Sequence, residues 1–218
     1  MPKSKRERKI HLTQTAKKDR DHKTKIINDV REAIDAHTNV FLFSYDNMRS
    51  SKFKDVRIAF RDSKIFMGKN KLLQLAMGKG AEDEYADNLR SVSKLCSGSV
   101  GLLMTSRPED EVLEYFKSFT SDDFARAGSV ASRTVKIKQA EVANHPVSMI
   151  EQFRKLGLPV EVQNGKVVIV GKDEHQLCKK GQELSTEQCK ALVHFGHKLA
   201  TFKVEIKCRW KEGDYVEF

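Results

Sequence analysis

The sequence predicts a layered α/β domain that is interrupted by a small β-rich inserted domain. Between about residues 17 and 122, short apolar runs alternate with amphipathic stretches, which is the pattern of strands and helices packed in layers. A strong β-hairpin signal at Asn164-Gly165 follows, and a half-buried strand over 202–209 comes near the end. That last strand needs a sheet to join, and the first region supplies one.

These patterns divide the chain into three segments. Residues 1–16 hold charge but too few apolar groups to pack, so we expect a basic extended arm. We expect a discontinuous α/β domain over 17–122 and 187–218. The β-rich insert is expected over 123–186.

The first region contains five helix patterns and three strand patterns. Apolar residues at spacings of three and four predict the helices, and unbroken apolar runs predict the strands. The predicted helices cover 17–37, 53–60, 70–76, 85–95 and 107–119. The predicted strands cover 40–45, 64–67 and 100–105. Ser106 is the expected N-cap of the fifth helix, with Glu109 at capping-box spacing.

The insert has a different pattern. Residues 134–138 alternate like an edge strand, and residues 159–163 and 166–170 flank Asn164-Gly165. Asn-Gly supplies the two positive φ angles of a type I′ turn, so a hairpin is expected there. Thr186 is the expected cap of a last helix, which precedes the final strand.

Positive charge is concentrated at the N-terminus. The 218 residues carry a net charge of +10, from 40 Lys and Arg against 30 Asp and Glu. The first 25 residues hold ten basic and three acidic side chains, and so carry +7 of that charge. The basic residues are Lys3, Lys5, Arg6, Arg8, Lys9, Lys17, Lys18, Arg20, Lys23 and Lys25. Such a segment attracts an RNA backbone through counterion release, although a solvated tail and a nuclear-import address are alternative interpretations.

A second cluster of lysines lies where a strand passes into a helix. Lys64, Lys69 and Lys71 surround Gly68, and Asn70 begins the predicted helix. A helix N-terminus offers unpaired N–H groups and a partial positive charge, and glycine lets a phosphate approach the backbone closely. This turn is therefore a candidate site for structured RNA, together with the basic helix and, less directly, Arg57 and Arg61. The alternative is a surface turn whose lysines serve solubility.

No catalytic or metal-binding pattern is found in the sequence. Gly68-Lys69-Asn70 resembles the end of a nucleotide-binding loop, but Ser63 stands where that loop needs glycine and Asn70 where it needs Ser or Thr. His194 and His197 fall short of the four ligands of a structural zinc site. We therefore predict a protein that is not an enzyme, with no cofactor, no metal and no small-molecule substrate.

The cysteines and the apolar runs of the sequence indicate where in the cell the protein is located. Cys96, Cys178, Cys189 and Cys208 are far apart and are expected to be free thiols. No stretch approaches the roughly 20 apolar residues of a membrane span, and the N-terminus lacks the apolar part of a secretory signal. We therefore expect an intracellular protein with no membrane partner.

Five short motifs resemble one protein family. Met67-Gly-Lys-Asn-Lys71, followed by a short apolar helix, resembles the signature of the ribosomal stalk-base family (bacterial L-ten and eukaryotic P-zero). Ser99-Val-Gly-Leu-Leu-Met-Thr105 is similar to the next strand of that family, and Ala125-Arg-Ala-Gly128 to its entry into the inserted domain. Pro2-Lys-Ser-Lys-Arg6 and Leu95-Cys-Ser-Gly98 resemble more narrowly its assembly-factor branch, the mRNA turnover proteins. The resemblance spans nearly the whole chain.

The resemblance implies a role in ribosome biogenesis and rRNA processing. It implies binding to the GTPase-associated region of large-subunit rRNA in nucleolar pre-60S particles, beside an L-eleven-type ribosomal protein and other assembly factors. It assigns RNA contacts to Lys64, Gly68, Lys69, Asn70 and Lys71, and to the basic residues of the arm and first helix. Nucleolus and nucleus are the expected locations, with a transient passage through the cytoplasm.

The C-terminal end suggests how this chain differs from a working stalk base. A stalk base carries C-terminal helices and an acidic tail that recruit translation factors, and we expect neither in a chain that ends at Phe218. The resemblance therefore implies a placeholder that the stalk-base protein later replaces. Two other functions stay open at this point, a working stalk base in translation and a factor linked to mRNA turnover. No nuclease pattern is present, so any effect on mRNA decay is expected to be indirect.

Overall fold

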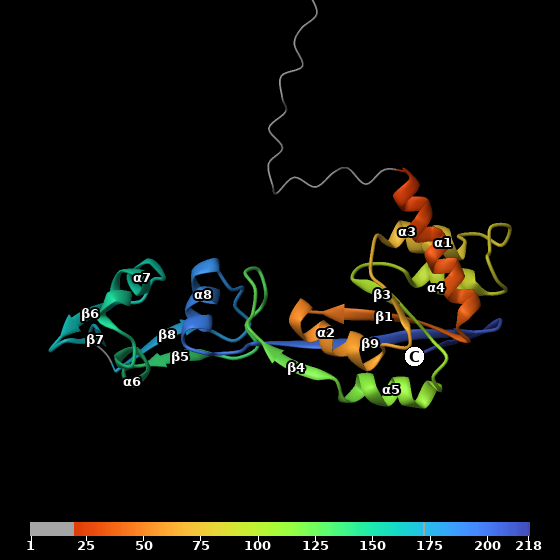
Figure 1. Cartoon of the computed structure of the whole chain (residues 1–218). Helices are drawn as coiled ribbons and strands as arrows, with labels where there is room; N and C mark the ends of the chain where they lie inside the picture. Colours follow the sequence, from red (N-terminus) through yellow and green to blue (C-terminus); the bar gives the residue numbers. More distant parts are fainter. Residues whose placement is uncertain (1–19, 172) are drawn as a thin grey trace, which may run out of the picture. The chain divides into compact units, whose positions relative to one another are not determined.

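Figure 1 shows the computed structural model of the chain, which describes residues 20–171 and 173–218. Helices and strands are mixed along the described chain, as the predicted α/β class requires. The helices are α1 (Arg20–Ala36), α2 (Ser50–Ala59), α3 (Asn70–Met77), α4 (Leu89–Leu95), α5 (Glu109–Ser118), α6 (Gln139–Ala143), the 3-10 turn η1 (Val147–Met149), α7 (Ile150–Lys155) and α8 (Thr186–His194). The strands are β1 (Asn39–Asp46), β2 (Lys64–Phe66), β3 (Val100–Thr105), β4 (Thr120–Asp123), β5 (Val135–Lys138), β6 (Val160–Gln163), β7 (Lys166–Ile169), β8 (Glu174–Cys178), β9 (Ala200–Lys211) and β10 (Asp214–Glu217). None of the described helices is long and apolar enough to cross a membrane.

Six of these strands form one sheet. Five follow the order β10-β9-β1-β3-β2, and β4 pairs with β9 outside that path. β2 pairs antiparallel with β3, with Lys64 opposite Met104. β9 turns back into β10, with Lys211 opposite Asp214. β2 is thus an edge strand, and the chain leaves that edge to enter α3.

The described chain divides into two compact units. The first contains the described residues up to Leu42, together with Ser63–Ser106 and Cys208–Phe218. Its core is one apolar cluster to which α1, α3 and α4 contribute on one side and the strands on the other. Val30 of α1, Met77 of α3 and Leu102 of β3 are completely buried in this cluster. The apolar face of α1 is buried in this cluster, which explains why its predicted amphipathic pattern becomes a helix.

The second unit contains Phe43–Asp62 and Arg107–Lys207, and it has two apolar centres. One is aromatic: Phe116 of α5 stacks against Phe60 at 5.4 Å and against Phe43 at 6.3 Å between ring centroids. The other is formed by the β-rich region, where Phe153 of α7 and Ile137 of β5 are completely buried. Side chains of α8, including Leu192, belong to this same cluster. The cluster thus extends beyond residue 186, where the sequence patterns place the end of the insert, while the domain boundaries themselves stay a prediction.

The hairpin of the insert has the predicted backbone geometry. β6 and β7 pair antiparallel with Gln163 opposite Lys166. Between them, Asn164 has φ of 50° and Gly165 has φ of 73°. Both values lie in the left-handed region that a type I′ turn needs, so the Asn-Gly prediction is confirmed.

Three predicted helix starts are wrong. Ser106 does not cap α5: the helix begins at Glu109 after Pro108, and the Ser106 hydroxyl lies 3.4 Å from Nδ1 of His37. α4 begins at Leu89 rather than near Tyr85: its N-cap residue Asn88 has a left-handed φ of 62°, and the Tyr85 hydroxyl donates to Asp35. These are contacts between distant parts of the sequence, and local patterns do not contain them.

The third correction concerns α8. Its N-cap is Ser185 and not Thr186. The Ser185 hydroxyl accepts from the backbone N–H of Gln188 at 3.2 Å, and Gln188 Oε1 accepts from the Ser185 N–H at 3.0 Å. This reciprocal pair of hydrogen bonds is a capping box. It explains why Ser185, and not the neighbouring Thr186, is the N-cap of α8.

Candidate nucleic-acid interface

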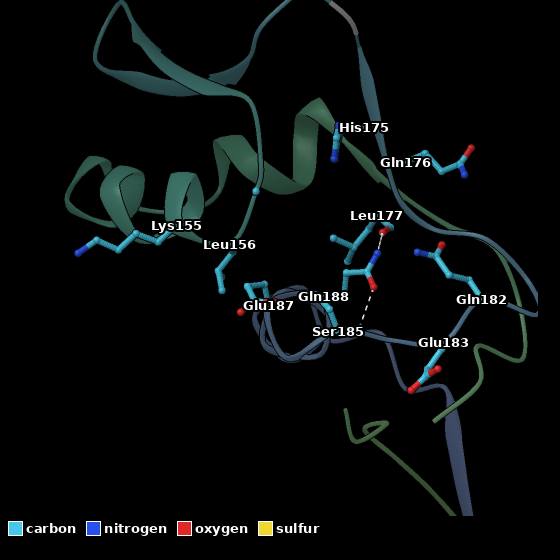
Figure 2. Close-up of a pocket in the computed structure, with 11 residues that line it drawn as sticks. Lys155, Leu156, His175, Gln176, Leu177, Gln182, Glu183, Ser185, Glu187 and Gln188 are labelled. Carbon is cyan, nitrogen blue, oxygen red and sulfur yellow. Dashed lines mark hydrogen bonds between the residues drawn. The ribbon is translucent and has the colours of Figure 1, made fainter. Parts of the chain in front are cut away.

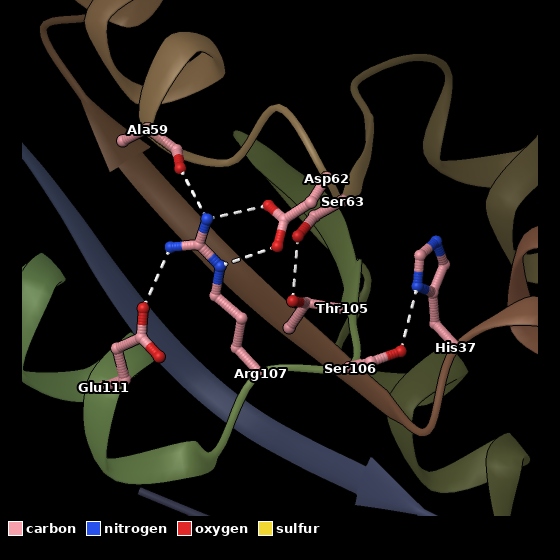
Figure 3. A network of polar contacts seen from close by, with 8 residues as sticks. All are labelled: His37, Ala59, Asp62, Ser63, Thr105, Ser106, Arg107 and Glu111. Atoms are coloured by element: carbon pink, nitrogen blue, oxygen red, sulfur yellow. Dashed lines mark hydrogen bonds and ion pairs between the residues drawn. The ribbon is translucent and has the colours of Figure 1, made fainter.

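The lysine-rich turn joins edge strand β2 to helix α3. Lys64 is exposed at the start of β2, where the preceding Ser63 hydroxyl is 2.8 Å from the Thr105 hydroxyl of β3 (Figure 3). Lys69 is the N-cap of α3, in an extended conformation, and its side chain makes no capping hydrogen bond. Lys69 and Lys71 are both exposed. The turn therefore presents three cations around a helix N-terminus that its own N-cap side chain leaves open.

Gly68 lies at the most open point of this turn. It is exposed, and its φ lies outside the left-handed region. A Cβ built on it would meet no atom within 4 Å. Neither a left-handed backbone conformation nor internal packing of the described chain thus requires glycine at this position, and the open surroundings leave the backbone accessible to close approach of another molecule.

Asn70 has a role that the sequence patterns did not indicate. It neither caps α3 nor points free into solvent: its Nδ2 donates to the carbonyl oxygen of Gly98 at 2.9 Å. One turn further along α3, Gln74 Nε2 donates to the Cys96 carbonyl oxygen at 3.1 Å. Two side-chain amides of α3 therefore hold the loop that connects α4 to β3. That loop contains the Leu95-Cys-Ser-Gly98 motif, whose resemblance was the sole sequence signal that pointed to it.

Helix α1 presents three more of the basic residues that are predicted to contact RNA. Arg20, Lys23 and Lys25 are exposed in its first two turns. The same helix packs against α3 and donates from Arg31 Nε to the Ala76 carbonyl oxygen at 3.1 Å. The guanidinium of Arg31 also lies 5.0 Å from the ring centre of Tyr85. The structure thus brings the basic helix and the helix of the lysine turn together in one unit.

Several predicted basic residues lie elsewhere. Lys3, Lys5, Arg6, Arg8, Lys9, Lys17 and Lys18 lie outside the described residues, so their contribution stays a prediction. Arg57 and Arg61 belong to the second unit. Arg57 lies over the ring of Phe53 at 5.4 Å, and Arg61 is exposed.

Arg107 is a cation with a structural role, as Figure 3 shows. Its guanidinium donates to both carboxylate oxygens of Asp62, at 2.8 and 2.9 Å, and to the Ala59 carbonyl oxygen at 2.8 Å. It also donates to Glu111 at 2.9 Å. The hydrogen bonds that Arg107 donates to Asp62 are the main reason that the pKa of Arg107 is raised. These contacts engage the guanidinium within the second unit.

A pocket in the β-rich region has a different character. Figure 2 shows it beside α7, β8 and the start of α8, with a volume of about 490 Å³. Two of its polar side chains, Ser185 and Gln188, form the capping box of α8, and Gln188 Nε2 also donates to the Leu177 carbonyl oxygen at 2.7 Å. The backbone and the Ser185 hydroxyl lower the pKa of Glu187. The lining thus holds stabilised acceptors, and we assign no chemistry to this pocket.

The cysteines and acidic clusters complete the survey. All four cysteines are free thiols, as predicted, and all four are buried. Burial is the main cause that raises the pKa of Cys96 to about 12 and that of Cys208 to about 11. Within residues 20–171 and 173–218, no group of three or more His, Cys, Asp or Glu could hold a metal ion.

Comparison with known proteins identifies the family. The family model of ribosomal protein L10 matches residues 18–121, and the model of the insertion domain found in 60S ribosomal proteins of this type matches residues 125–196. The ribosome assembly factor mrt4 of Neurospora crassa is 41% identical over 100% of this chain and 93% of that relative. The ribosome assembly factor mrt4 of Dictyostelium discoideum is 36% identical over 99% of this chain and 96% of the relative.

Working ribosomal proteins are also related, but more distantly. The large ribosomal subunit protein uL10 of Oxybasis rubra is 27% identical over 84% of this chain, and the match covers 56% of that relative. The similarity thus extends along nearly the full length of the assembly factors and along little more than half of the uL10 protein. The chain therefore belongs to the ribosomal protein L10 family, within the branch that contains the ribosome assembly factors mrt4.

Proposed function

We propose that this protein is a ribosome assembly factor that binds large-subunit rRNA in pre-60S particles. The observation that carries the proposal is the exposed lysine turn, in which Lys64, Lys69 and Lys71 surround an open glycine at the N-terminus of α3. The names of the relatives that match along nearly their full length support the assembly role.

The proposed contact with RNA has two parts. Lys69 and Lys71 neutralise phosphates next to the α3 N-terminus, and Arg20, Lys23 and Lys25 of α1 extend the positive surface. Gly68 lets the RNA backbone approach the turn closely. This arrangement recognises the shape of folded RNA through phosphates and 2′-hydroxyls. The basic residues before Arg20 would lengthen the same contact.

The proposed target is the GTPase-associated region of large-subunit rRNA, next to an L-eleven-type ribosomal protein. We infer that the chain occupies this position as a placeholder in nucleolar particles and is later exchanged for the stalk-base protein. Identity of 36–41% to assembly factors, against 27% to a uL10 protein, supports this function over a working role in translation.

Binding of a GTPase-associated rRNA fragment to the purified chain tests the RNA contact. The double variant Lys69→Ala/Lys71→Ala should weaken binding and flatten the slope of log affinity against log salt by about 1.4–1.8, since each lost phosphate contact removes about 0.7–0.9. Lys52→Ala/Lys54→Ala, which removes two exposed lysines of α2, is the matched control. Equal slopes for the two double variants would refute the lysine turn as the RNA contact.

Purification of the tagged protein from cells tests the placeholder function. Particles with precursor large-subunit rRNA and without the stalk-base protein are the expected result. Particles with mature rRNA and a complete stalk would instead favour a working stalk base. Recovery without any ribosomal particle would contradict both.

A further inference from the structure

We propose that the loop Ser97–Ser99 is a second, uncharged part of the RNA-binding surface, and that Asn70 and Gln74 are the residues that position it. This inference rests on the proposed RNA-binding function. It adds a set of contacts that neither the charge pattern nor the lysine turn indicates.

The loop is short and firmly anchored at both ends. Cys96 and Val100, which flank it, are only 2% and 5% exposed, whereas Ser97, Gly98 and Ser99 are all exposed. Burial raises the pKa of the Cys96 thiol to about 12, so this anchor stays neutral and apolar. Gly98 has φ of 70°, a left-handed conformation that glycine adopts without strain between the two hydroxyl residues. The result is a three-residue exposed segment held between two buried residues.

The amides of α3 fix where this projection lies. Asn70 Nδ2 donates to the Gly98 carbonyl oxygen at 2.9 Å, and Gln74 Nε2 donates to the Cys96 carbonyl oxygen at 3.1 Å. Asn70 lies between Lys69 and Lys71 in the sequence, so the hydrogen bond holds the middle of the loop against the lysine turn. A molecule that approaches Gly68 and its flanking lysines therefore also meets the loop.

The chemistry of the loop differs from that of the turn. Ser97 and Ser99 offer hydroxyls that can donate to phosphate oxygens or exchange hydrogen bonds with ribose 2′-hydroxyls. Neutral contacts release no condensed counterions, so they contribute affinity that does not depend on salt. Lysine contacts depend strongly on salt. This difference makes the two parts of the surface separable in an experiment.

The experiment measures binding of the full chain to the GTPase-associated rRNA fragment and to an unrelated RNA hairpin of equal length, at several salt concentrations. Ser97→Ala/Ser99→Ala should weaken binding to the fragment about 3- to 30-fold, with an unchanged salt slope, because two neutral hydrogen bonds are lost. Ser50→Ala/Ser51→Ala, at exposed positions of α2, is the matched control. Lys69→Ala should instead flatten the slope of log affinity against log salt, because it removes a charged contact.

A second comparison tests positioning. Asn70→Ala and Gln74→Ala should each weaken binding with an unchanged slope, and each should lower the NMR backbone order parameters of Gly98 and Ser99 in the free protein. The triple variant Asn70→Ala/Ser97→Ala/Ser99→Ala should bind nearly as well as Asn70→Ala alone, because both changes remove the same contacts. Thermal unfolding confirms that each variant is folded at the assay temperature.

The experiment distinguishes failure of the proposed RNA-binding function from failure of the loop contact and of the positioning role. If the wild-type chain binds the rRNA fragment no better than the unrelated hairpin, the proposed function and this inference both fail. If the wild type discriminates but Ser97→Ala/Ser99→Ala binds like the control, the loop contact alone is refuted. If the effects of Asn70→Ala and the serine changes simply add, Asn70 contacts RNA itself and the positioning role is refuted.

Discussion

Glycines at the two ends of α3 illustrate how differently one residue type can be used. Gly68 before the helix has an ordinary φ and open surroundings. Gly78 after it has φ of 97°, and an added Cβ would lie 2.4 Å from the Asp83 carbonyl oxygen. The second glycine is needed for folding, whereas the first is free to serve an interaction.

This contrast gives a prediction for stability. Gly68→Ala should change the free energy of unfolding by less than about 0.5 kcal/mol, since it adds no strain and meets no neighbour. Gly78→Ala should cost more than about 2 kcal/mol, because it combines left-handed strain with a backbone clash. Urea unfolding of the two variants measures both. A large loss for Gly68→Ala would mean that Gly68 is structural, and its proposed role in RNA approach would lose its basis.

The buried thiols of the first unit should make stability depend on pH. Burial raises the folded-state pKa of Cys96 to about 12 and of Cys208 to about 11, against an unperturbed value of 9.0. Below about pH 9 both thiols are protonated in the folded and unfolded states, so their contribution to stability is complete. As pH rises from about 9 toward 11, the unfolded state loses these protons first and the contribution declines.

Urea midpoints between pH 8 and 10.5 test this linkage. Wild-type stability should fall more steeply with pH than that of Cys96→Ala, because the variant lacks one of the titrating thiols. Lysines titrate in both proteins and cancel in the comparison. Parallel pH profiles would show that Cys96 is as easily ionised in the fold as in the unfolded chain.

At the scale of elements, local patterns succeeded where one segment holds the whole signal. The apolar strand β3 and the Asn164-Gly165 hairpin lie where the sequence patterns put them, because buried runs and left-handed turns depend on neighbouring residues. β4 was missed: Thr120-Ser-Asp-Asp123 has no apolar alternation and is a strand because it pairs with β9. Tertiary pairing decides such segments, and one sequence does not show it.

The same reasoning explains which part of the candidate site was predictable. The lysines and the glycine of the β2–α3 turn lie close together in the sequence, so these residues could be predicted from the sequence alone. The bond from Asn70 to Gly98 joins residues 28 positions apart, and the contact from Arg31 to Ala76 joins residues 45 positions apart. No periodicity encodes these contacts. The position of the loop beside the turn thus required the structure.

At the scale of the whole molecule, the chain builds separate apolar cores from interleaved segments. Trp210 is the single tryptophan of the sequence, and it packs in the core of the first unit with its Nε1 donating to the Asp87 carbonyl oxygen at 2.8 Å. Phe153 is completely buried in the core of the β-rich region. Each core therefore contains a residue that can report on it or perturb it alone.

This separation predicts two unfolding events. Phe153→Ala should destabilise the β-rich region by about 3–5 kcal/mol, since it removes a buried aromatic side chain and leaves a cavity. The urea midpoint of the transition followed by Trp210 fluorescence should equal that of the wild type, while part of the far-UV circular dichroism signal is lost at lower urea.

The Phe153→Ala protein should also keep the affinity and salt slope of the wild type for the rRNA fragment, because the lysine turn and the Ser97–Ser99 loop belong to the first unit. A coincident shift of the fluorescence and dichroism transitions would instead mean that the two cores fold as one cooperative body, and the RNA-binding surface would then depend on the insert for its stability.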